Sequence, residues 1–416
     1  MTSRISKYLP IILAAVFLAS CGGSDSGDTP PVVVEPDREP EQVTIGGAGN
    51  MGIFDPSVAR DPASGRLWMS YSSVNSSSFY ASNVFWLVSI RLAYSDDNGV
   101  SWTDADVVAA PHVEAVVGPM TESHPTGEIL VNSAGIWQSE TSSLIYDPGA
   151  PVAERWKLLI YQYLNANLIS YFADHGWMTI KMAATPLELA DATSVKLFGG
   201  IGLKTDGSNT GSPVFSPTGG MPAIQLNTDL SQSVGGNTLT DLDLCAFAEP
   251  GLHATDSAMY MAIFCADIST NPLSEHIEYF RCDSPCDVAL ASSWEYLGRL
   301  LTIADAQTAT GDHHYQAPDF VEKDGKTYLL VTPVNNTVGN LYNGCRVYEF
   351  EDLNTTQLKH TNGILTEVAR VNGDTDTHHG ACSTFADVDG GILLSQLKVN
   401  GTEVTFTIYK SQVSLP

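Results

Sequence analysis

Residues 317–333 read APDFVEKDGKTYLLVTP and give the clearest indication of the fold. A short segment runs to Asp324-Gly325, and a second, apolar run, Lys326–Thr332, follows it. Runs of this length between turn residues are typical of β-strands, and Asp-Gly is a strong turn signal between two strands. This stretch therefore predicts two neighbouring strands of one sheet.

Four other stretches of the chain have the same form, and they begin at Phe54, Ser139, Ala248 and Ala381. Their apolar second strands are expected at Arg66–Ser72, Trp156–Tyr163, Ala258–Cys265 and Gly391–Leu397. Five such sheets in a ring make a β-propeller, in which only short, protected sheet edges remain. We therefore expect an all-β fold, a five-bladed β-propeller over residues 43–416, with one or two β-sandwiches as the alternative.

The ends of this region carry two further strand-like segments, Glu41–Ile45 (EQVTI) and Thr402–Tyr409 (TEVTFTIY). Both have the β-branched composition that strands favour. We expect the first to add a strand to the fifth sheet and so help to close the ring.

Composition limits the classes of function. The chain has 416 residues, with 20 Lys+Arg against 47 Asp+Glu, so that its formal net charge is −27. This balance argues against a nucleic-acid partner, because phosphate binding needs clustered basic residues. It suits a protein that handles a neutral or cationic ligand.

The N-terminus indicates export. Basic residues Arg4 and Lys7 precede an apolar run, Tyr8–Ser20, that is too short for a mature membrane span. The run ends in Leu18-Ala19-Ser20-Cys21, which resembles a bacterial lipobox; a plain secretory signal is the alternative. The resemblance implies removal of residues 1–20, lipidation of Cys21 and, because Gly22 follows, attachment to the outer membrane of a Gram-negative bacterium. Residues 21–42 are rich in Gly, Ser, Pro and acids, and are expected to be a disordered tether.

Six cysteines remain after Cys21, an even number that suggests up to three disulfides in an oxidising compartment. Cys282 and Cys286 enclose a turn, so a local bridge is expected there, with a zinc site as the alternative. Cys245 and Cys265 flank an expected hairpin.

Two short motifs carry a resemblance to a known family. Asp55-Pro56-Ser57-Val58 is followed by Gly65-Arg66-Leu67-Trp68-Met69, and Ala317-Pro318-Asp319-Phe320 is followed by a similar second strand. Both resemble the blade openings of five-bladed propeller glycosidases, namely glycoside hydrolase family 43 and its invertase-like relatives. The resemblance implies a carbohydrate substrate and a glycosidase activity.

Residues 95–102, SDDNGVSW, resemble the Asp box of sialidases and other propellers. This motif makes a tight turn, in which Asp97 accepts backbone hydrogen bonds, Gly99 takes a positive φ and Trp102 packs beneath. We therefore interpret Asp97 as structural. Phe54-Asp55-Pro56 stands where sialidases have an arginine motif, which argues against a sialidase.

Alignment of the five expected inner strands places a carboxylate at one level in three of them: Asp55, Glu140 and Glu249. In the fourth and fifth strands the level falls near Gln316 or Ala317 and near Gly380 or Ala381. Glycoside hydrolysis needs two carboxyl groups, one to activate water and one to protonate the leaving oxygen. The resemblance implies Asp55 as general base, Glu140 as the group that raises the pKa of the acid, and Glu249 as general acid. The family usually has Asp in the second role.

Residues near the strand entrances are candidates for substrate binding. The aromatic rings could stack on sugars, and the histidines and the amide could bind hydroxyls; the candidates are Phe54, Trp137, His314, Tyr315, Gln316 and His379. We expect no required cofactor and assign no metal ligands, although a structural Ca²⁺ ion in the axial channel is one possibility. A site made of two histidines with Asp319 or Asp376 is another.

Two functions stay open at this stage. The first is an exported, lipid-anchored and monomeric glycoside hydrolase, inverting, that acts on neutral glycans and touches the membrane only through its anchor. The second is a surface propeller that binds glycan or protein without cleaving it. In that case the carboxylates could be neutralised by Arg60, Arg91 or Arg346.

Overall fold

The computed structural model describes residues 33–34, 41–80, 83–115, 134–166, 175–199, 232–233, 245–267, 274–288, 293–335, 341–373, 378–384, 391–400, 403–413 and 415. Residues 1–20 and Cys21 lie outside this set, so the signal and the lipidation site stay predictions. Among the described residues, none of the helices has the length and apolar character needed to cross a membrane.

The first three sheets each contain four antiparallel strands in chain order. The first sheet has β3 (Gly52–Arg60), β4 (Leu67–Tyr80), β5 (Asn83–Ser95) and β6 (Thr103–Ala109). The second has β8 (Ala134–Tyr146), β9 (Trp156–Ala166), β10 (His175–Ala183) and β11 (Ser194–Gly199), with β7 (His112–Ala115) beside β8. The third has β13 (Cys245–Ala254), β14 (Ala258–Asp267), β15 (Ser274–Asp283) and β16 (Trp294–Leu301), with β12 (Gln232–Ser233) beside β16.

The fourth and fifth sheets follow the same plan. The fourth has β17 (His314–Lys323), β18 (Lys326–Asn335), β20 (Gly344–Asp352) and β24 (Glu367–Asn372), to which β1 (Val33–Val34), β19 (Leu341–Tyr342) and β21 (Gln357–Leu358) add short pairings. The fifth has β25 (His378–Ser383), β26 (Leu393–Asn400) and β27 (Glu403–Lys410). The remaining elements are α2 (Ile303–Ala309), the hairpin β22 (His360–Thr361) and β23 (Ile364–Leu365), and 3₁₀ turns at Val152–Glu154 and Leu187–Leu189.

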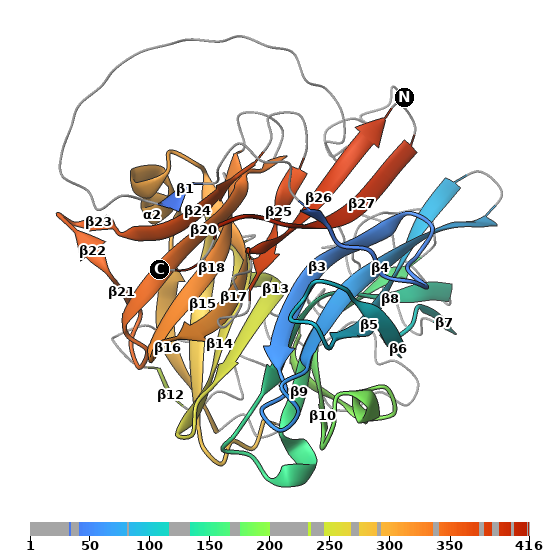
Figure 1. The fold of residues 1–416 in the computed structure, drawn as a ribbon, viewed down its shortest axis with the longest axis horizontal. Helices are drawn as coiled ribbons and strands as arrows, with labels where there is room; N and C mark the ends of the chain where they lie inside the picture. The colour runs from blue at the N-terminus through green and yellow to red at the C-terminus, as the bar shows by residue number, and fades with distance from the viewer. Residues whose placement is uncertain are drawn as a thin grey trace, which may run out of the picture.

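The five first strands form a closed ring. β3 contacts β8, β8 contacts β13, β13 contacts β17, β17 contacts β25, and β25 contacts β3. Figure 1 shows the sheets following one another around the molecule in chain order, with the red strands of the fifth sheet returning to the blue strands of the first. The fold is therefore a five-bladed β-propeller, as predicted, and the sandwich alternative was wrong.

A short strand from the N-terminal side closes the ring. β2 (Glu41–Gln42) pairs antiparallel with β27, and the Val43 N–H donates to the Ile408 carbonyl at 2.8 Å. This confirms the predicted closing strand. On the same edge of β27, opposite the one that pairs with β26, β27 also meets β3, where Gly52 lies opposite Phe406; a Cβ on Gly52 would come within 1.8 Å of the Phe406 carbonyl oxygen. The contact between β27 and β3 therefore requires glycine at position 52.

The core lies between neighbouring blades, and β14 shows why its sequence is apolar throughout. Its side chains alternate in direction, so Met259, Met261 and Ile263 pack toward the second blade, whereas Tyr260 and Phe264 pack toward the fourth. Because both faces of the sheet are covered, this strand reads as a continuous apolar run rather than as an apolar–polar alternation.

Each inner strand is interrupted at the same level by a bulge that holds one residue at positive φ. These residues are Asp55, Thr141, Glu249, Ala317 and Ala381, with φ between 46° and 51°. The predicted alignment of the first and third inner strands is thus correct. In the fourth and fifth inner strands the bulge position is taken by Ala317 and Ala381. In the second strand the prediction was wrong by one residue, because Thr141 and not Glu140 takes the bulge position.

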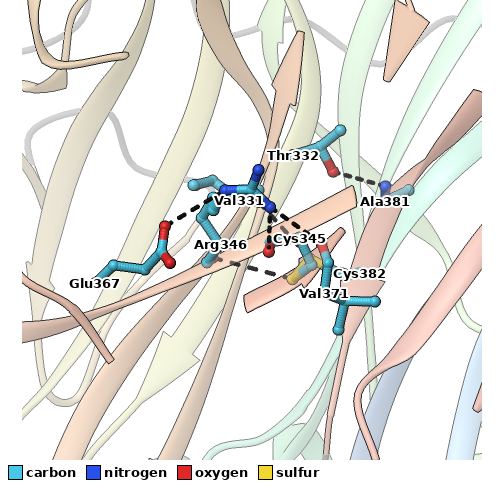
Figure 2. The surroundings of a disulfide bond; sticks show 8 residues. All are labelled: Val331, Thr332, Cys345, Arg346, Glu367, Val371, Ala381 and Cys382. Carbon is cyan, nitrogen blue, oxygen red and sulfur yellow. Dashed lines mark hydrogen bonds and ion pairs between the residues drawn. A yellow bond between two sulfur atoms is a disulfide. The ribbon is translucent and has the colours of Figure 1, made fainter. Parts of the chain in front are cut away.

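Disulfide bonds lie within the third blade and between the fourth and fifth blades. Cys282 and Cys286 are bridged, which confirms the predicted local bond and excludes the zinc alternative for this pair. Cys345 on β20 is bridged to Cys382 on β25, so this bond joins the fourth blade to the fifth (Figure 2). Close by, the Ala381 N–H donates to Thr332 Oγ1 at 2.7 Å, a second link between these blades. Cys265 is also disulfide-bonded.

The turn at residues 95–102 has the geometry expected of it. Asp97 accepts hydrogen bonds from the Ser101 N–H at 2.9 Å and from the Ser101 hydroxyl, and these bonds lower its pKa to about 2. Gly99 has a φ of 85°, and Trp102 is buried in the core between the first and fifth blades. Asp97 therefore has a structural role.

Candidate active site

Three carboxylates meet at the centre of the ring, where the inner strands of the first three blades bulge. Asp55 comes from β3, Glu140 from β8 and Glu249 from β13. Burial raises the pKa of Asp55 well above its usual value, and the negative charges of Glu140 and Glu249 raise it further. The structure thus brings together the three acids that the sequence singled out, within electrostatic reach of one another.

Asp55 is buried and held by hydroxyl groups. Ser72 and Thr141 each donate a hydrogen bond to Asp55 Oδ2 at 3.2 Å, while the Asp55 N–H donates to Ser395 Oγ at 2.8 Å. The Thr141 N–H in turn donates to Ser72 Oγ at 3.1 Å. The positive-φ residue of the second blade therefore orients the carboxylate of the first, a role that the sequence alignment missed.

Glu140 accepts a hydrogen bond from the Tyr163 hydroxyl at 2.9 Å. Burial raises the pKa of Glu140 to about 7, with a further contribution from the charge of Glu249, while the Tyr163 hydrogen bond opposes the shift. Near neutral pH this side chain therefore exists in both its protonated and its charged form.

Glu249 is held at both oxygens. The Tyr342 hydroxyl donates to Oε1 at 2.6 Å, and the Ala317 N–H donates to Oε2 at 3.0 Å. Burial raises the pKa of Glu249, and these two hydrogen bonds and the nearby His314 limit the rise. The bulge of the fourth blade, which carries only an alanine side chain, thus supplies a backbone donor to the carboxylate of the third.

The three acids are not neutralised by the arginines considered above. Arg91 pairs with Asp104 at 2.5 Å, and Arg346 pairs with Glu367 at 3.4 Å and donates to backbone carbonyls (Figure 2). Arg60 donates to the Gly65 carbonyl and to Asn98 on the surface. Since three close carboxylates resist simultaneous ionisation, the cluster can hold at least one proton near neutral pH.

Several predicted substrate-binding residues lie elsewhere. Tyr315 is only 1% exposed; it packs in the core between the third and fourth blades, where its hydroxyl meets that of Tyr348 at 2.6 Å. The prediction for Tyr315 was wrong because alternation along β17 turns this side chain into the interface between blades. Trp137 is buried with His112 stacked on it, and Phe54 packs on Phe406 at 4.9 Å between ring centroids. Trp137 is therefore covered, whereas Phe54 is partly exposed and its role as a substrate contact stays a prediction.

The polar candidates remain near the entrances of the inner strands. His314 is buried on β17 and acts electrostatically on Glu249, and Gln316 is partly exposed two residues further along the same strand. His379 is buried on β25 next to Asn343. Substrate contact by Gln316 and His379 stays a prediction, whereas His314, only 1% exposed, is covered as Tyr315 is.

Below the carboxylates a small cavity of about 20 Å³ continues along the axis, lined among others by Asp55, Thr141 and Asp319. Burial raises the pKa of Asp319 to about 7. These oxygen atoms are of the type that Ca²⁺ prefers, but Ca²⁺ takes six to eight of them, so water would have to complete the shell. The axial calcium ion stays a prediction, and Asp376 lies outside the described residues.

A larger cavity of about 310 Å³ opens where the inner strands end, at the opposite side of the ring. Its lining includes Arg60, Tyr146, His253, Phe320 and Asp319, but none of the three carboxylates. We therefore place the candidate active site at the carboxylate cluster and not at this cavity.

No family model matches the sequence, and no curated protein matches it. Among solved structures the chain is similar to an arabinanase from Bacillus subtilis, at 10% identity and a TM-score of 0.41, over 88% of this chain and 96% of that one. It is also similar to an endo-arabinase from Bacteroides thetaiotaomicron, at 12% identity and a TM-score of 0.40, over 89% of this chain and 97% of that one.

A thermostable family-43 glycoside hydrolase is similar at 13% identity and a TM-score of 0.44, over 89% of this chain and 96% of that one. The propeller glycosidases that the sequence motifs resemble are thus among the proteins whose structures this chain resembles. These likenesses are too distant to carry an argument, so the activity has to be argued from the carboxylates themselves.

Proposed function

We propose that this protein is a glycoside hydrolase whose active site is the cluster of Asp55, Glu140 and Glu249. The observation that carries the proposal is that acids from three different blades converge beside the bulges of their strands, where they accept hydrogen bonds from hydroxyl groups and a backbone N–H. Burial raises the pKa of each acid, and the charges of Glu140 and Glu249 raise that of Asp55 further. A cluster of buried like charges is unfavourable for folding alone, and perturbed titration of this kind is typical of active sites. Cleavage of a glycosidic bond uses this set of groups.

In the proposed reaction Asp55 is the general base. It takes a proton from a water molecule, whose oxygen attacks the anomeric carbon of the sugar, and the hydrogen bonds from Ser72 and Thr141 fix its orientation. As the bond to the leaving oxygen breaks, Glu249 gives that oxygen its proton. The water enters opposite the leaving group, so the anomeric configuration is inverted. Proton exchange with solvent then restores both carboxyl groups.

Glu140 acts on the base in this scheme. It touches neither the attacking water nor the leaving oxygen, but its negative charge raises the pKa of Asp55 and so makes that carboxylate a stronger base. Tyr163 holds it in place through the hydrogen bond to Oε2. Glu140 can fill this role although it precedes the bulge residue, because the role depends on distance between charges and not on a particular backbone position.

The proposed substrates are neutral glycans. The centre of the ring gathers negative charge, and the chain as a whole carries a formal net charge of −27, so acidic sugars would be repelled. We further propose that the enzyme is exported, anchored to the outer membrane through lipidated Cys21, and monomeric. The Cys21→Ala variant should then appear in the soluble fraction, whereas the wild-type protein should partition with membranes.

The test of the proposed function is hydrolysis of neutral polysaccharides and of aryl glycosides by the wild-type protein and its variants. Asp55→Asn should lower kcat/KM on every substrate by about 10²–10⁴-fold, the usual contribution of a general base. Glu249→Gln should lose activity on natural glycans but keep much of it on aryl glycosides whose leaving group needs no proton. Asp96→Asn, on the surface, is the matched control and should leave the rate unchanged.

The anomeric form of the first product, observed by NMR, tests inversion directly. Retention of configuration would overturn the assignment of Asp55 as a base that acts through water. If the wild-type protein binds glycans but the screen finds no hydrolysis, the protein is a binding propeller and the proposed activity is wrong.

A further inference from the structure

A second cluster of chemically reactive side chains lies where the third and fourth blades meet. Glu275, on β15, places Oε2 at 3.2 Å from His313 Nδ1 and at 3.1 Å from His314 Nδ1. The two Nδ1 atoms are themselves 2.9 Å apart. The three atoms therefore form a nearly equilateral triangle of one oxygen and two nitrogens.

This convergence is unusual for neighbours in sequence, because adjacent residues of a strand point to opposite faces. His313 stands just before β17, and its N–H donates to the Val334 carbonyl at 2.8 Å. Its ring can therefore turn toward that of His314, which stacks on Phe264 at 5.7 Å between ring centroids. The start of the strand thus directs both imidazoles at one carboxylate.

Hydrogen bonds alone do not satisfy this triangle. The carboxylate oxygen only accepts, and each neutral imidazole has one proton to place on one of its two nitrogens. If only one Nδ1 carries a proton, it can donate to one of the other two atoms. The other Nδ1 and the carboxylate oxygen then face each other with lone pairs. If both carry protons, the two N–H groups face each other at 2.9 Å. A cation held by all three atoms removes every one of these conflicts.

The size of the triangle fits such an ion. Zinc binds imidazole nitrogen and carboxylate oxygen at about 2.0–2.1 Å, so two ligand atoms of a tetrahedral site lie about 3.3 Å apart, and adjacent atoms of an octahedral site about 3.0 Å apart. The edges found here, from 2.9 to 3.2 Å, lie close to both values.

We propose that Glu275, His313 and His314 form a binding site for a divalent transition-metal ion of the zinc class. Two imidazoles and one carboxylate favour ions such as Zn²⁺, Co²⁺ or Ni²⁺ over Ca²⁺ and Mg²⁺, which prefer oxygen. The side chains of His313 and Glu275 are 27% and 14% exposed, so an ion can enter from solvent and keep water or another small ligand in its open positions. His314, 2% exposed, anchors the site from within.

The site is distinct from the carboxylate cluster, although His314 lies near enough to Glu249 to act on it electrostatically. It is also distinct from the group formed by Cys265, His276 and Glu278. Those three side chains also lie close together, but Cys265 is disulfide-bonded and has no thiolate to offer. The metal site does not depend on the proposed glycosidase activity, and its test does not use that activity.

The test is calorimetric titration of the purified full chain, stripped of metal by a chelator, with Zn²⁺, Co²⁺ and Ca²⁺. We expect one equivalent of Zn²⁺ or Co²⁺ to bind, Co²⁺ to show the visible absorption of a nitrogen-ligated ion, and excess Ca²⁺ not to compete. His313→Ala and Glu275→Gln should each weaken binding by at least about tenfold. His360→Ala, in the exposed hairpin, is the matched control and should bind as the wild-type protein does.

Absence of binding to the wild-type protein would overturn the proposal. So would binding that His313→Ala and Glu275→Gln leave unchanged, since the ion would then lie elsewhere. Circular dichroism of each variant shows whether the fold is kept. Should a variant unfold, the Co²⁺ spectrum of the wild-type protein still decides the matter, because a site made only of oxygen ligands would contradict the proposed imidazole ligands.

Discussion

The acids at the centre of the ring differ from the acids buried within the blades. Asp147 is buried against Lys157, with Oδ2 and Nζ 3.1 Å apart, and Glu367 is buried against Arg346 at 3.4 Å. Asp55, Glu140 and Glu249 instead receive hydrogen bonds from hydroxyl groups and one backbone N–H. Among the residues that the structure describes, the groups that act on them through their charge are one another and, for Glu249, His314. Within the described part of the chain, Asp147 and Glu367, which serve the structure, are thus paired with Lys or Arg, whereas the acids that we assign to chemistry are not.

The largest loss of stability is expected where a buried acid loses the basic residue that neutralises it. Lys157→Met leaves Asp147 buried without its charged partner, so the free energy of unfolding should fall by about 3–5 kcal/mol, measured by urea denaturation. The double variant Lys157→Met/Asp147→Asn should recover part of this loss, because no uncompensated charge is then buried. A loss below about 1 kcal/mol in the single variant would mean that the two kinds of acid do not differ as described.

At the centre of the ring, removal of a charged group is expected to raise the free energy of unfolding instead of lowering it. The pKa of Glu140 is about 7 in the folded protein against 4.5 for an ordinary Glu, so the native state binds this proton more tightly than the unfolded state does. The resulting stabilisation is complete below pH 4.5 and is lost as the pH rises through 7. Glu140→Gln keeps an acceptor for Tyr163 and should be more stable than the wild-type protein above pH 7, by up to about 3 kcal/mol.

Urea denaturation at pH 5 and pH 8 measures this difference, and exposed Glu403→Gln serves as the control without a pH-dependent effect. If Glu140→Gln were less stable than the wild-type protein at pH 8, the charge of Glu140 would be compensated after all.

A smaller effect, on the pH dependence of activity, tests whether Glu249 is the general acid of the cluster. Tyr342→Phe removes the hydrogen bond to Glu249 Oε1, which favours the charged carboxylate, so the pKa of Glu249 should rise. As general acid, Glu249 would then keep its proton to higher pH. The alkaline limb of the kcat/KM profile should move to higher pH, with kcat changed by less than about tenfold. A profile that moves to lower pH would be evidence against Glu249 as the acid.

The smallest effect belongs to the surface. Arg66 and Asp96 form an ion pair at 2.7 Å, but the Asp96 side chain is 62% exposed. Asp96→Asn should change the free energy of unfolding by less than about 1 kcal/mol, and added salt should reduce even that difference. Thermal denaturation at low and high salt provides the measurement. A loss as large as that of Lys157→Met would show that exposure does not separate these pairs.

The propeller could be predicted because its signals are local. Turn residues and apolar runs recur in each blade, and the bulges place Asp55 and Glu249 where the aligned strands predict them. The position of Glu140 could not be fixed, since a bulge shifts the register by one residue and Ser139-Glu140-Thr141 shows no sign of which residue takes the positive φ.

Other parts of the site depend on contacts between blades that are remote in sequence. Tyr342 reaches Glu249 across 93 residues, and Ser72 and Thr141 reach Asp55 from a neighbouring strand and a neighbouring blade. Glu275 meets His313 and His314 only because two sheets pack side by side. A sequence shows which residues are able to take part in such contacts, but the packing of the blades decides which of them meet.

The pairing of β2 with β27 also makes the order of the blades along the gene arbitrary. Glu41 lies opposite Lys410, so a linker from the segment after Lys410 to residue 41 could make the polypeptide circular, with the loss of only the short pairing of β1 with β24. A new start could then be opened in the exposed turn at residues 62–65, between β3 and β4. In such a permutant the ring would close within the first blade instead of the fifth, and the carboxylate cluster would be rebuilt from the same strands in a different genetic order.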